Sequence, residues 1–302
     1  MAETLYLKQM ECGPMQNYVY LLGDPATRQA AVVDPAWDVE RIVQAAQQDG
    51  YTISKVLITY THQDHTGGEL FGHYIPGVVE LLELVDVPVY VPKTETHILK
   101  NVPASSKVPT ESNQMIDLGG DVQITLLHTP GHTPGSQCFL VQQRLISGDT
   151  LFIGACGRVD LPDSSPEAMY DSLFGKLLRL DDTLQVFPAH NYKGTPVTTI
   201  GQEKAENPRL ENRDRAAFVE QMRALNLGMP DHLTEALRTN RTGGKTVAQL
   251  LDEAARQIAF MSMEEVRQRV TEHDPELVVL DVRERDAYEA AHIPGARHIP
   301  RG

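Results

Sequence analysis

Groups that can bind a metal ion are concentrated just after an apolar stretch early in the chain. The segment Tyr60-Thr-His62-Gln-Asp64-His65 directly follows residues 56–59 and places two imidazoles and a carboxylate within four residues. Three further groups of these types lie at the ends of other strand-like stretches, at His132, Asp149 and His190. Ions of the zinc and iron class bind neutral imidazole and carboxylate donors that converge on one point. We therefore predict metal chemistry, with six candidate ligands: His62, Asp64, His65, His132, Asp149 and His190.

Composition narrows the possible partners. The chain has 302 residues and a formal net charge of −14, which argues against nucleic acid or an anionic membrane surface as its main partner. No apolar run approaches the roughly 18 residues of a membrane helix, and the N-terminus does not resemble a signal peptide. Three scattered cysteines are too few for a disulfide framework. We therefore expect a cytoplasmic protein.

Strand and helix signals alternate over the first 190 residues. Short β-type runs occur at residues 17–22, 30–33, 53–59, 87–91, 122–127 and 137–146. A helix is predicted to begin after Asp38 and to end near Gly50, and a second to begin at Pro166 with Ser165 as its N-cap. The segment 207–238 is predicted to be helical. Helices outside two β-rich halves suggest a four-layer αββα sandwich of the α/β (α+β) class.

The order of the candidate ligands adds a family resemblance. His-x-Asp-His at residues 62–65, followed at a distance by His132, Asp149 and His190, resembles the metallo-β-lactamase superfamily. The resemblance implies the same αββα fold, with the metal on the loops that join the strands. We assign residues 1–242 to this catalytic domain and residues 243–260 to a helical linker.

The C-terminal region begins a new unit near residue 261. Residues 277–284 are predicted to form a buried strand that ends in charged residues, and His292-Ile-Pro-Gly295 follows. This pattern resembles the opening of a rhodanese domain, whose active loop carries a catalytic cysteine further along. No cysteine follows Cys156. We therefore interpret residues 261–302 as a truncated rhodanese-like segment and expect no sulfurtransferase activity from it.

Within the superfamily, three motifs resemble the persulfide dioxygenases. They are Gly154-Ala-Cys156-Gly-Arg158-Val-Asp160, Pro188-Ala-His190-Asn-Tyr192-Lys193, and Glu206-Asn-Pro208-Arg209. The resemblance implies a mononuclear Fe(II) enzyme, with Zn(II) as the alternative, that oxidises glutathione persulfide or a related persulfide with O2 to sulfite. It also implies a pocket for the thiol carrier formed by Arg158, Tyr192 and Arg209, because guanidinium groups bind carboxylates bidentately.

Tyr60 departs from the family pattern, in which a histidine that binds iron stands at this position. Three outcomes follow. His62 replaces that histidine beside His132 and Asp149, or Tyr60 itself binds the metal as phenolate, or the metal moves to Asp64, His65, His190 and Asp149. We take Asp64 and Tyr60 as candidate catalytic residues.

Two other functions remain open from the sequence. A thioester hydrolase of the glyoxalase II type uses the same scaffold with a metal-activated water. The second is a non-catalytic metal-binding component of a sulfur-relay complex, with a sulfurtransferase as partner. The apolar segment within residues 69–100 is either a plain extension of the fold, a lid or a homodimer contact. Oxygen uptake with glutathione persulfide, compared with thioester hydrolysis, would separate the three functions.

Overall fold

The computed structural model describes residues 5–13, 15–70, 73–190, 194–225, 261–272, 274, 277–281 and 285–299. The chain divides into two compact units, residues 1–247 and 248–302, and each is described by itself. The predicted linker 243–260 and the predicted helical residues 226–238 lie outside the described residues. In the described part of the chain, no helix is long and apolar enough to cross a membrane.

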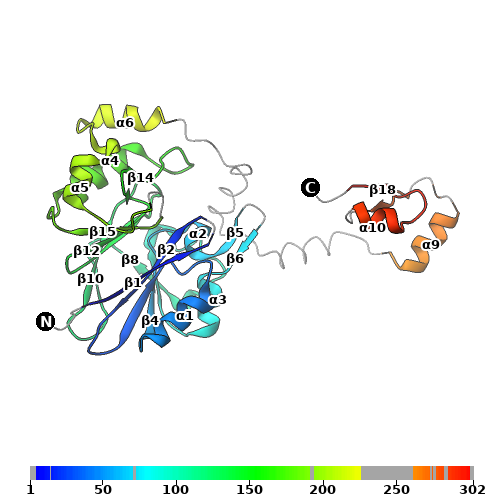
Figure 1. Cartoon of the computed structure of the whole chain (residues 1–302), viewed down its shortest axis with the longest axis horizontal. Helices are drawn as coiled ribbons and strands as arrows, with labels where there is room; N and C mark the ends of the chain where they lie inside the picture. Colours follow the sequence, from blue (N-terminus) through cyan, green and yellow to red (C-terminus); the bar gives the residue numbers. More distant parts are fainter. Residues whose placement is uncertain are drawn as a thin grey trace. The chain divides into compact units, whose positions relative to one another are not determined.

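The first unit contains two six-stranded sheets (Figure 1). In spatial order, the first sheet consists of β1 (Tyr6–Cys12), β2 (Asn17–Gly23), β3 (Gln29–Val33), β4 (Thr52–Leu57), β7 (Val89–Pro92) and β8 (Lys107–Thr110). The second consists of β16 (Thr198–Thr199), β15 (Gln185–Pro188), β12 (Arg144–Gly148), β11 (Gln137–Val141), β10 (Gln123–His128) and β9 (Met115–Asp117). β3, β4, β7 and β8 run parallel, as do β12 and β15, whereas the remaining pairs are antiparallel.

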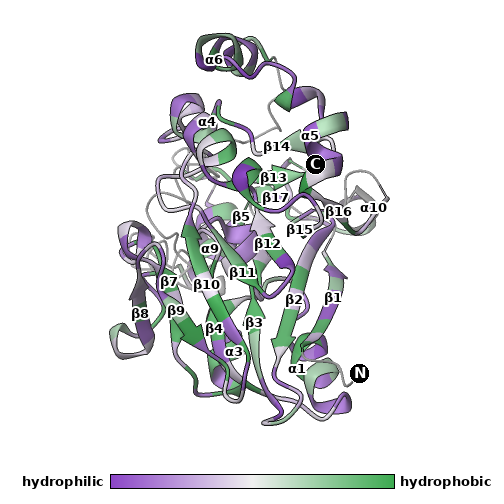
Figure 2. Ribbon diagram, turned by 90° about the vertical axis from the view of Figure 1, so that its left-hand side faces the viewer, coloured by the Kyte–Doolittle hydropathy of each residue, from purple (hydrophilic) through white to green (hydrophobic). Residues whose placement is uncertain are grey.

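Apolar side chains from both sheets fill the space between them. Tyr20, Leu57 and Val33 of the first sheet share one buried cluster with Phe139 and Ile146 of the second. Figure 2 shows the corresponding hydrophobic stretches along β10 and β11. Since each sheet must also cover its outer face, helices pack on both sides and complete the predicted αββα sandwich.

The helices belong to two separate outer layers. On the first sheet, α1 (Val39–Gln48) and α3 (Val78–Leu84) bury Val39, Ile42 and Leu81 against the strands. On the second sheet, buried side chains come from α4 (Pro166–Gly175), α5 (Ile200–Glu206) and α6 (Arg215–Arg223). Short 3₁₀ turns are η1 (Lys93–Glu95), η2 (Ala104–Ser106), η3 (Leu177–Arg179) and η4 (Pro208–Leu210). Small hairpins are β5 (Gly68–Leu70) with β6 (His73–Ile75) and β13 (Leu151–Phe152) with β14 (Ala155–Cys156).

Local sequence signals predicted some elements better than others. Helix α4 begins as expected, with the Ser165 hydroxyl accepting the Ala168 N–H at 3.1 Å. The predicted single run 137–146 is wrong, because it is a hairpin of β11 and β12 that turns at Gln142, whose φ is +51°. Positive φ is rarely adopted by residues other than glycine, so the glutamine gave no sign of the turn.

The described residues of the second unit form a helix followed by a β-α-β crossover. These elements are α9 (Met263–Thr271), β17 (Leu280–Asp281), α10 (Arg285–Ala290) and β18 (Arg297–His298), with β17 and β18 parallel. The Ser262 hydroxyl caps α9 together with the Glu265 carboxylate. The prediction of a buried strand at residues 277–284 is wrong for the part that the structure describes: Val278 is 61% and Leu280 51% exposed, since a two-stranded sheet has few side chains to cover it.

Candidate metal centre

The candidate ligands come together because each follows a strand of one of the two sheets. Residues 58–62 leave the end of β4 and enter the single-turn helix α2 (Gln63–Thr66), which carries Asp64 and His65. His132 lies in the loop between β10 and β11. Asp149 directly follows β12, and His190 follows β15 by two residues. All six predicted ligands therefore lie at one edge of the sandwich.

Three of these residues, Asp64, His65 and His190, form a compact group that we call the second donor set. Their ligand atoms lie within 4.8 Å of one another, and all three side chains are buried. Asp64 Oδ2 is 3.2 Å from His65 Nε2 and 3.5 Å from His190 Nε2. Donors that surround one ion at about 2.1 Å are themselves roughly 3.0–3.4 Å apart. The spacing therefore suits a shared cation.

The first donor set consists of His62, His132 and Asp149. His62 Nδ1 is 3.3 Å from His132 Nε2, which is 3.5 Å from Asp149 Oδ2. The other carboxylate oxygen, Asp149 Oδ1, faces the second donor set, 3.7 Å from His65 Nε2 and 3.5 Å from His190 Nε2. Asp149, although counted in the first set, therefore presents one carboxylate oxygen to each set.

Asp149 Oδ1 is buried and accepts no hydrogen bond from the described residues. A buried carboxylate oxygen without a partner is unfavourable, because water no longer solvates its charge. A cation among the surrounding imidazoles would remove that cost. The residues present therefore fit a metal ion.

Hydrogen bonds on the outer side fix the orientation of three imidazole rings. His65 Nδ1 donates to Asp34 Oδ2 at 3.0 Å, His132 Nδ1 to the Arg158 carbonyl at 2.9 Å, and His190 Nδ1 to the Met15 carbonyl at 3.0 Å. In each ring, Nε2 is left to face the centre. Such outer partners set the tautomer and strengthen a histidine as a ligand.

Tyr60 fills the space between the two donor sets. Its side chain is 1% exposed, and its hydroxyl lies 2.6 Å from His65 Nε2. The ring also contacts the imidazoles of His62 and His132, with centroid distances of 4.7 and 4.9 Å. Burial raises the pKa of Tyr60 well above its ordinary value, and the carboxylates of Asp149 and Asp64 raise it further. These effects oppose the formation of a phenolate ligand.

Burial and mutual interaction also set the charges of the neighbouring groups. Burial lowers the pKa of His62 to about 3, with a further contribution from His132, so His62 is neutral. Burial alone would raise the pKa of Asp64, but the His65 and His190 imidazoles hold it below its usual range. Burial alone would lower the pKa of His65, yet Asp64 and Asp34 raise it well above its ordinary value. A metal that binds His65 must therefore displace a proton.

Comparison with known families gives an independent assignment. A model of the metallo-beta-lactamase superfamily matches residues 12–190, more than half of the chain, and a rhodanese-like domain model matches residues 262–302. The chain belongs to the metallo-β-lactamase superfamily. The predicted superfamily, its αββα fold and the rhodanese-like segment are thereby confirmed.

Relatives of two activities are similar to this chain. Hydroxyacylglutathione hydrolase of Alkalilimnicola ehrlichii is 38% identical over 201 residues, which cover 67% of this chain and 72% of that protein. Mitochondrial persulfide dioxygenase ETHE1 of Bos taurus is 30% identical over 242 residues, covering 79% and 88%. The crystal structure of ETHE1 from Myxococcus xanthus has a TM-score of 0.67 and 31% identity, covering 80% of this chain and 100% of that one. The protein is an enzyme of this superfamily.

The predicted thiol-carrier residues lie partly in the described structure. The Arg158 guanidinium donates from Nε and Nη2 to the two Asp160 carboxylate oxygens, each at 2.7 Å. Arg209 lies in η4, which the Asn207 side chain ties to the Ala155 carbonyl at 3.0 Å. Tyr192 lies outside the described residues. The pocket assignment therefore stays a prediction.

Gly157 allows the backbone carbonyl of Arg158 to approach the His132 ring of the metal centre. A Cβ at this position would lie 1.9 Å from the Asp149 carbonyl oxygen, so only glycine allows β14 to pack against Asp149. This approach brings the carbonyl of Arg158 to His132 Nδ1. The Cys-Gly-Arg motif therefore supports the metal centre directly through its backbone.

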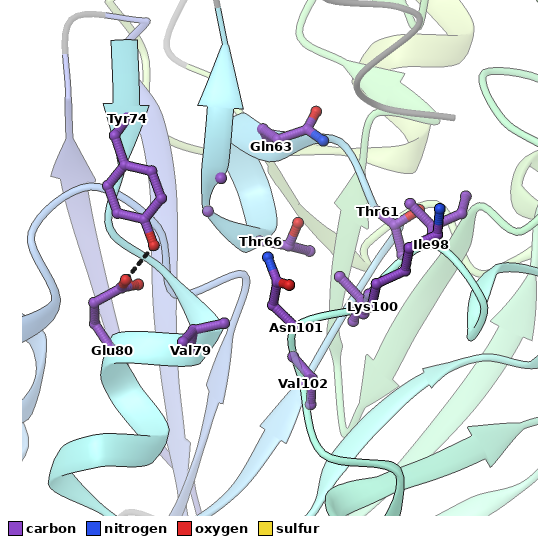
Figure 3. Close-up of a pocket in the computed structure, with 13 residues that line it drawn as sticks. Thr61, Gln63, Thr66, Tyr74, Val79, Glu80, Ile98, Lys100, Asn101 and Val102 are labelled. Atoms are coloured by element: carbon purple, nitrogen blue, oxygen red, sulfur yellow. Dashed lines mark hydrogen bonds between the residues drawn. The ribbon is translucent and has the colours of Figure 1, made fainter. Parts of the chain in front are cut away.

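A cavity opens beside the first donor set. It has a volume of about 300 Å³ and is lined by His62 and Thr61, by Thr133 and Pro134, and by Glu95. A narrower pocket lies on another side of Thr61, where Gln63 and Thr66 of α2 face Lys100 and Asn101 (Figure 3). Of these two hollows, the larger one is lined by a candidate ligand, His62, and the narrower one by none.

Sequence reasoning missed several supporting residues. Asp34 accepts from the Thr59 N–H and hydroxyl as well as from His65, and could have been noticed because it ends the apolar run of β3. The Asn17 amide donates to the backbone carbonyl and carboxylate of Asp64 at 3.0 and 3.1 Å. Trp37 Nε1 donates to Asn17 Oδ1 at 3.1 Å. Nothing in the local sequence marks either Asn17 or Trp37.

Proposed function

We propose that the protein oxidises a low-molecular-weight persulfide, such as glutathione persulfide, with O2. The observation that carries this proposal is the second donor set, two imidazoles and one carboxylate that face Asp149. Two histidines and one carboxylate with open positions suit mononuclear iron(II) oxygenases. Tyr60 stands where a further imidazole would complete the neighbouring site, which favours one resident metal over two.

Asp64, His65 and His190 would hold the ion, and Asp149 Oδ1 would face it. Iron(II), when bound, would supply redox chemistry between the persulfide sulfur and O2; zinc(II) is the alternative occupant. The reaction balances as RS–SH, O2 and water giving RSH, sulfite and two protons. Of the three outcomes drawn for Tyr60, the shift of the metal to this set has the most support, because Asp64, His65 and His190 already form a compact group of ligand atoms. Burial opposes the phenolate. His62 beside His132 and Asp149 is the remaining alternative.

The chain's own residues would bind and orient the substrate. The cavity beside His62 would admit the thiol carrier, and the neutral His62 imidazole forms part of its lining. Arg158 and Arg209 would bind the two carboxylates of glutathione, with Tyr192 as a further donor. Arg158 already pairs with Asp160, so a substrate carboxylate must share or replace that partner.

Thioester hydrolysis of the glyoxalase II type is the second candidate. It is favoured by the first donor set, which shares Asp149 and offers His62 and His132 to a second metal. The similarity to hydroxyacylglutathione hydrolase supports it as well. Two metals would act together on a water molecule and the thioester carbonyl.

Metal content and substrate choice test the proposal together. Protein purified without added metal is analysed for iron and zinc, then assayed for oxygen uptake and sulfite with glutathione persulfide and for hydrolysis of S-lactoylglutathione. We expect one iron per chain and persulfide-dependent oxygen uptake. Two metals with thioester hydrolysis would reject the dioxygenase in favour of the hydrolase. Bound metal with neither activity would favour the non-catalytic sulfur-relay role.

A further inference from the structure

Glu95 is a buried carboxylate that none of the roles above uses. It lies in the 3₁₀ turn η1, directly after β7, and its side chain is 3% exposed. One oxygen, Oε2, accepts the Thr61 N–H at 3.0 Å and the Thr61 hydroxyl at 2.9 Å. The other, Oε1, accepts the Gly135 N–H at 2.7 Å. A buried carboxylate is unfavourable without such donors, so these contacts define its position.

The two loops that Glu95 joins carry the first donor set. Thr61 lies between Tyr60 and His62 in the loop after β4 of the first sheet. Gly135 follows His132 by three residues in the loop between β10 and β11 of the second sheet. Glu95 therefore bridges the two sheets at the level of His62 and His132, whose ring nitrogens lie 3.3 Å apart.

Close packing makes the contact specific. A Cβ at Gly135 would lie 2.5 Å from Glu95 Cδ, so any other residue at this position would displace the carboxylate from its present place. Closer to the sheets, Gln137 at the start of β11 joins the residues that follow β4. Its backbone N–H donates to the Thr59 carbonyl at 2.9 Å, and its side-chain amide donates to the Ile58 carbonyl at 2.7 Å. The strand ends are therefore joined independently of Glu95, which contacts the loops beyond them.

We propose that Glu95 is a positioning residue that sets the placement of the His62 imidazole relative to the His132 imidazole. Because Glu95 also lines the 300 Å³ cavity, it fixes the wall along which substrate approaches. This inference goes beyond the proposed function, because it concerns His62 and His132 of the first donor set, whereas the proposed metal lies in the second. It holds whichever metal or reaction the centre supports, because it is about the metal-free protein.

The test is Glu95→Gln, examined by long-range ¹H–¹⁵N NMR of the histidine rings in metal-free full-length protein. Glutamine keeps the size of the side chain, but its NH2 group replaces one accepting oxygen, so either Thr61 or Gly135 loses its acceptor. We expect the ring signals of His62 and His132 to shift or split, while those of His65 and His190 stay in place. Thr61→Val removes only the hydroxyl donor and should shift the His62 and His132 signals by less than Glu95→Gln does.

Glu111→Gln is the matched control, because Glu111 is exposed and pairs with Lys93 of the same 3₁₀ turn at 2.6 Å. It should move none of the four sets of signals. Unchanged His62 and His132 signals in Glu95→Gln would overturn the proposal. So would equal shifts of all four rings with a lower thermal midpoint, since that pattern indicates a general structural role. If Glu95→Gln does not fold, the Thr61→Val result decides. Failure of the proposed function would be seen instead in the wild-type metal content and assays.

Discussion

Replacing Tyr60 by phenylalanine separates the effect of its hydroxyl from that of its ring. The hydroxyl lies 2.6 Å from His65 Nε2, the nitrogen that a metal in the second donor set would use. A metal bound there must break this contact. Tyr60 therefore stabilises the metal-free protein and weakens metal binding, and its removal should change the two properties in opposite directions.

The expected magnitude follows from a single hydrogen bond. The net contribution of such a bond to stability is about 0.5–1.5 kcal/mol. Loss of about 1 kcal/mol from the metal-free state corresponds to roughly fivefold tighter metal binding in Tyr60→Phe, because 1.4 kcal/mol is tenfold. The free energy of unfolding of the metal-free variant should fall by a similar amount, about 1 kcal/mol.

Two measurements check this expectation. Anaerobic competition with a chelator gives the Kd for iron(II) and zinc(II), and urea unfolding gives the stability of the metal-free protein. Tyr20→Phe is the control: Tyr20 is 1% exposed, and its hydroxyl donates to the Pro188 carbonyl at 2.5 Å rather than to a candidate ligand. The control should lose stability without a change in Kd. Weaker metal binding in Tyr60→Phe would refute the reasoning, since it would make the hydroxyl a ligand.

Three further predictions follow from the site. Asp149→Asn should lower metal content at least tenfold, because its carboxylate faces both donor sets; full metal content in elemental analysis would exclude Asp149 as a ligand. Arg158→Ala should raise KM for glutathione persulfide about ten- to hundredfold, as loss of a charge-assisted hydrogen bond of about 1.5–3 kcal/mol implies, and unchanged kinetics would remove it from the thiol-carrier pocket. Native protein at pH 8 should react very slowly with a disulfide reagent and quickly in urea, because burial raises the pKa of Cys12 and Cys138 to about 11 and of Cys156 to about 12; rapid native labelling would contradict that burial.

Local patterns in the sequence predicted much of the framework. Ser165 and Pro166 define the start of α4, because capping and proline geometry depend only on neighbouring residues. The apolar runs located β2, β3 and β4, and the polar groups after such runs predicted which loops meet at one edge of the sandwich. The hairpin within residues 137–146 was missed, since a glutamine at positive φ carries no turn signal.

The pairings inside the site were decided by the tertiary structure alone. The sequence supplied six donors and the departure at Tyr60, but three arrangements of a metal remained compatible with it. Only the folded chain places the Tyr60 hydroxyl on His65, Asp34 behind the same ring, and Glu95 between Thr61 and Gly135. These contacts join residues up to 40 positions apart in sequence, and their strength depends on burial and distance. Neither quantity exists until the two sheets pack.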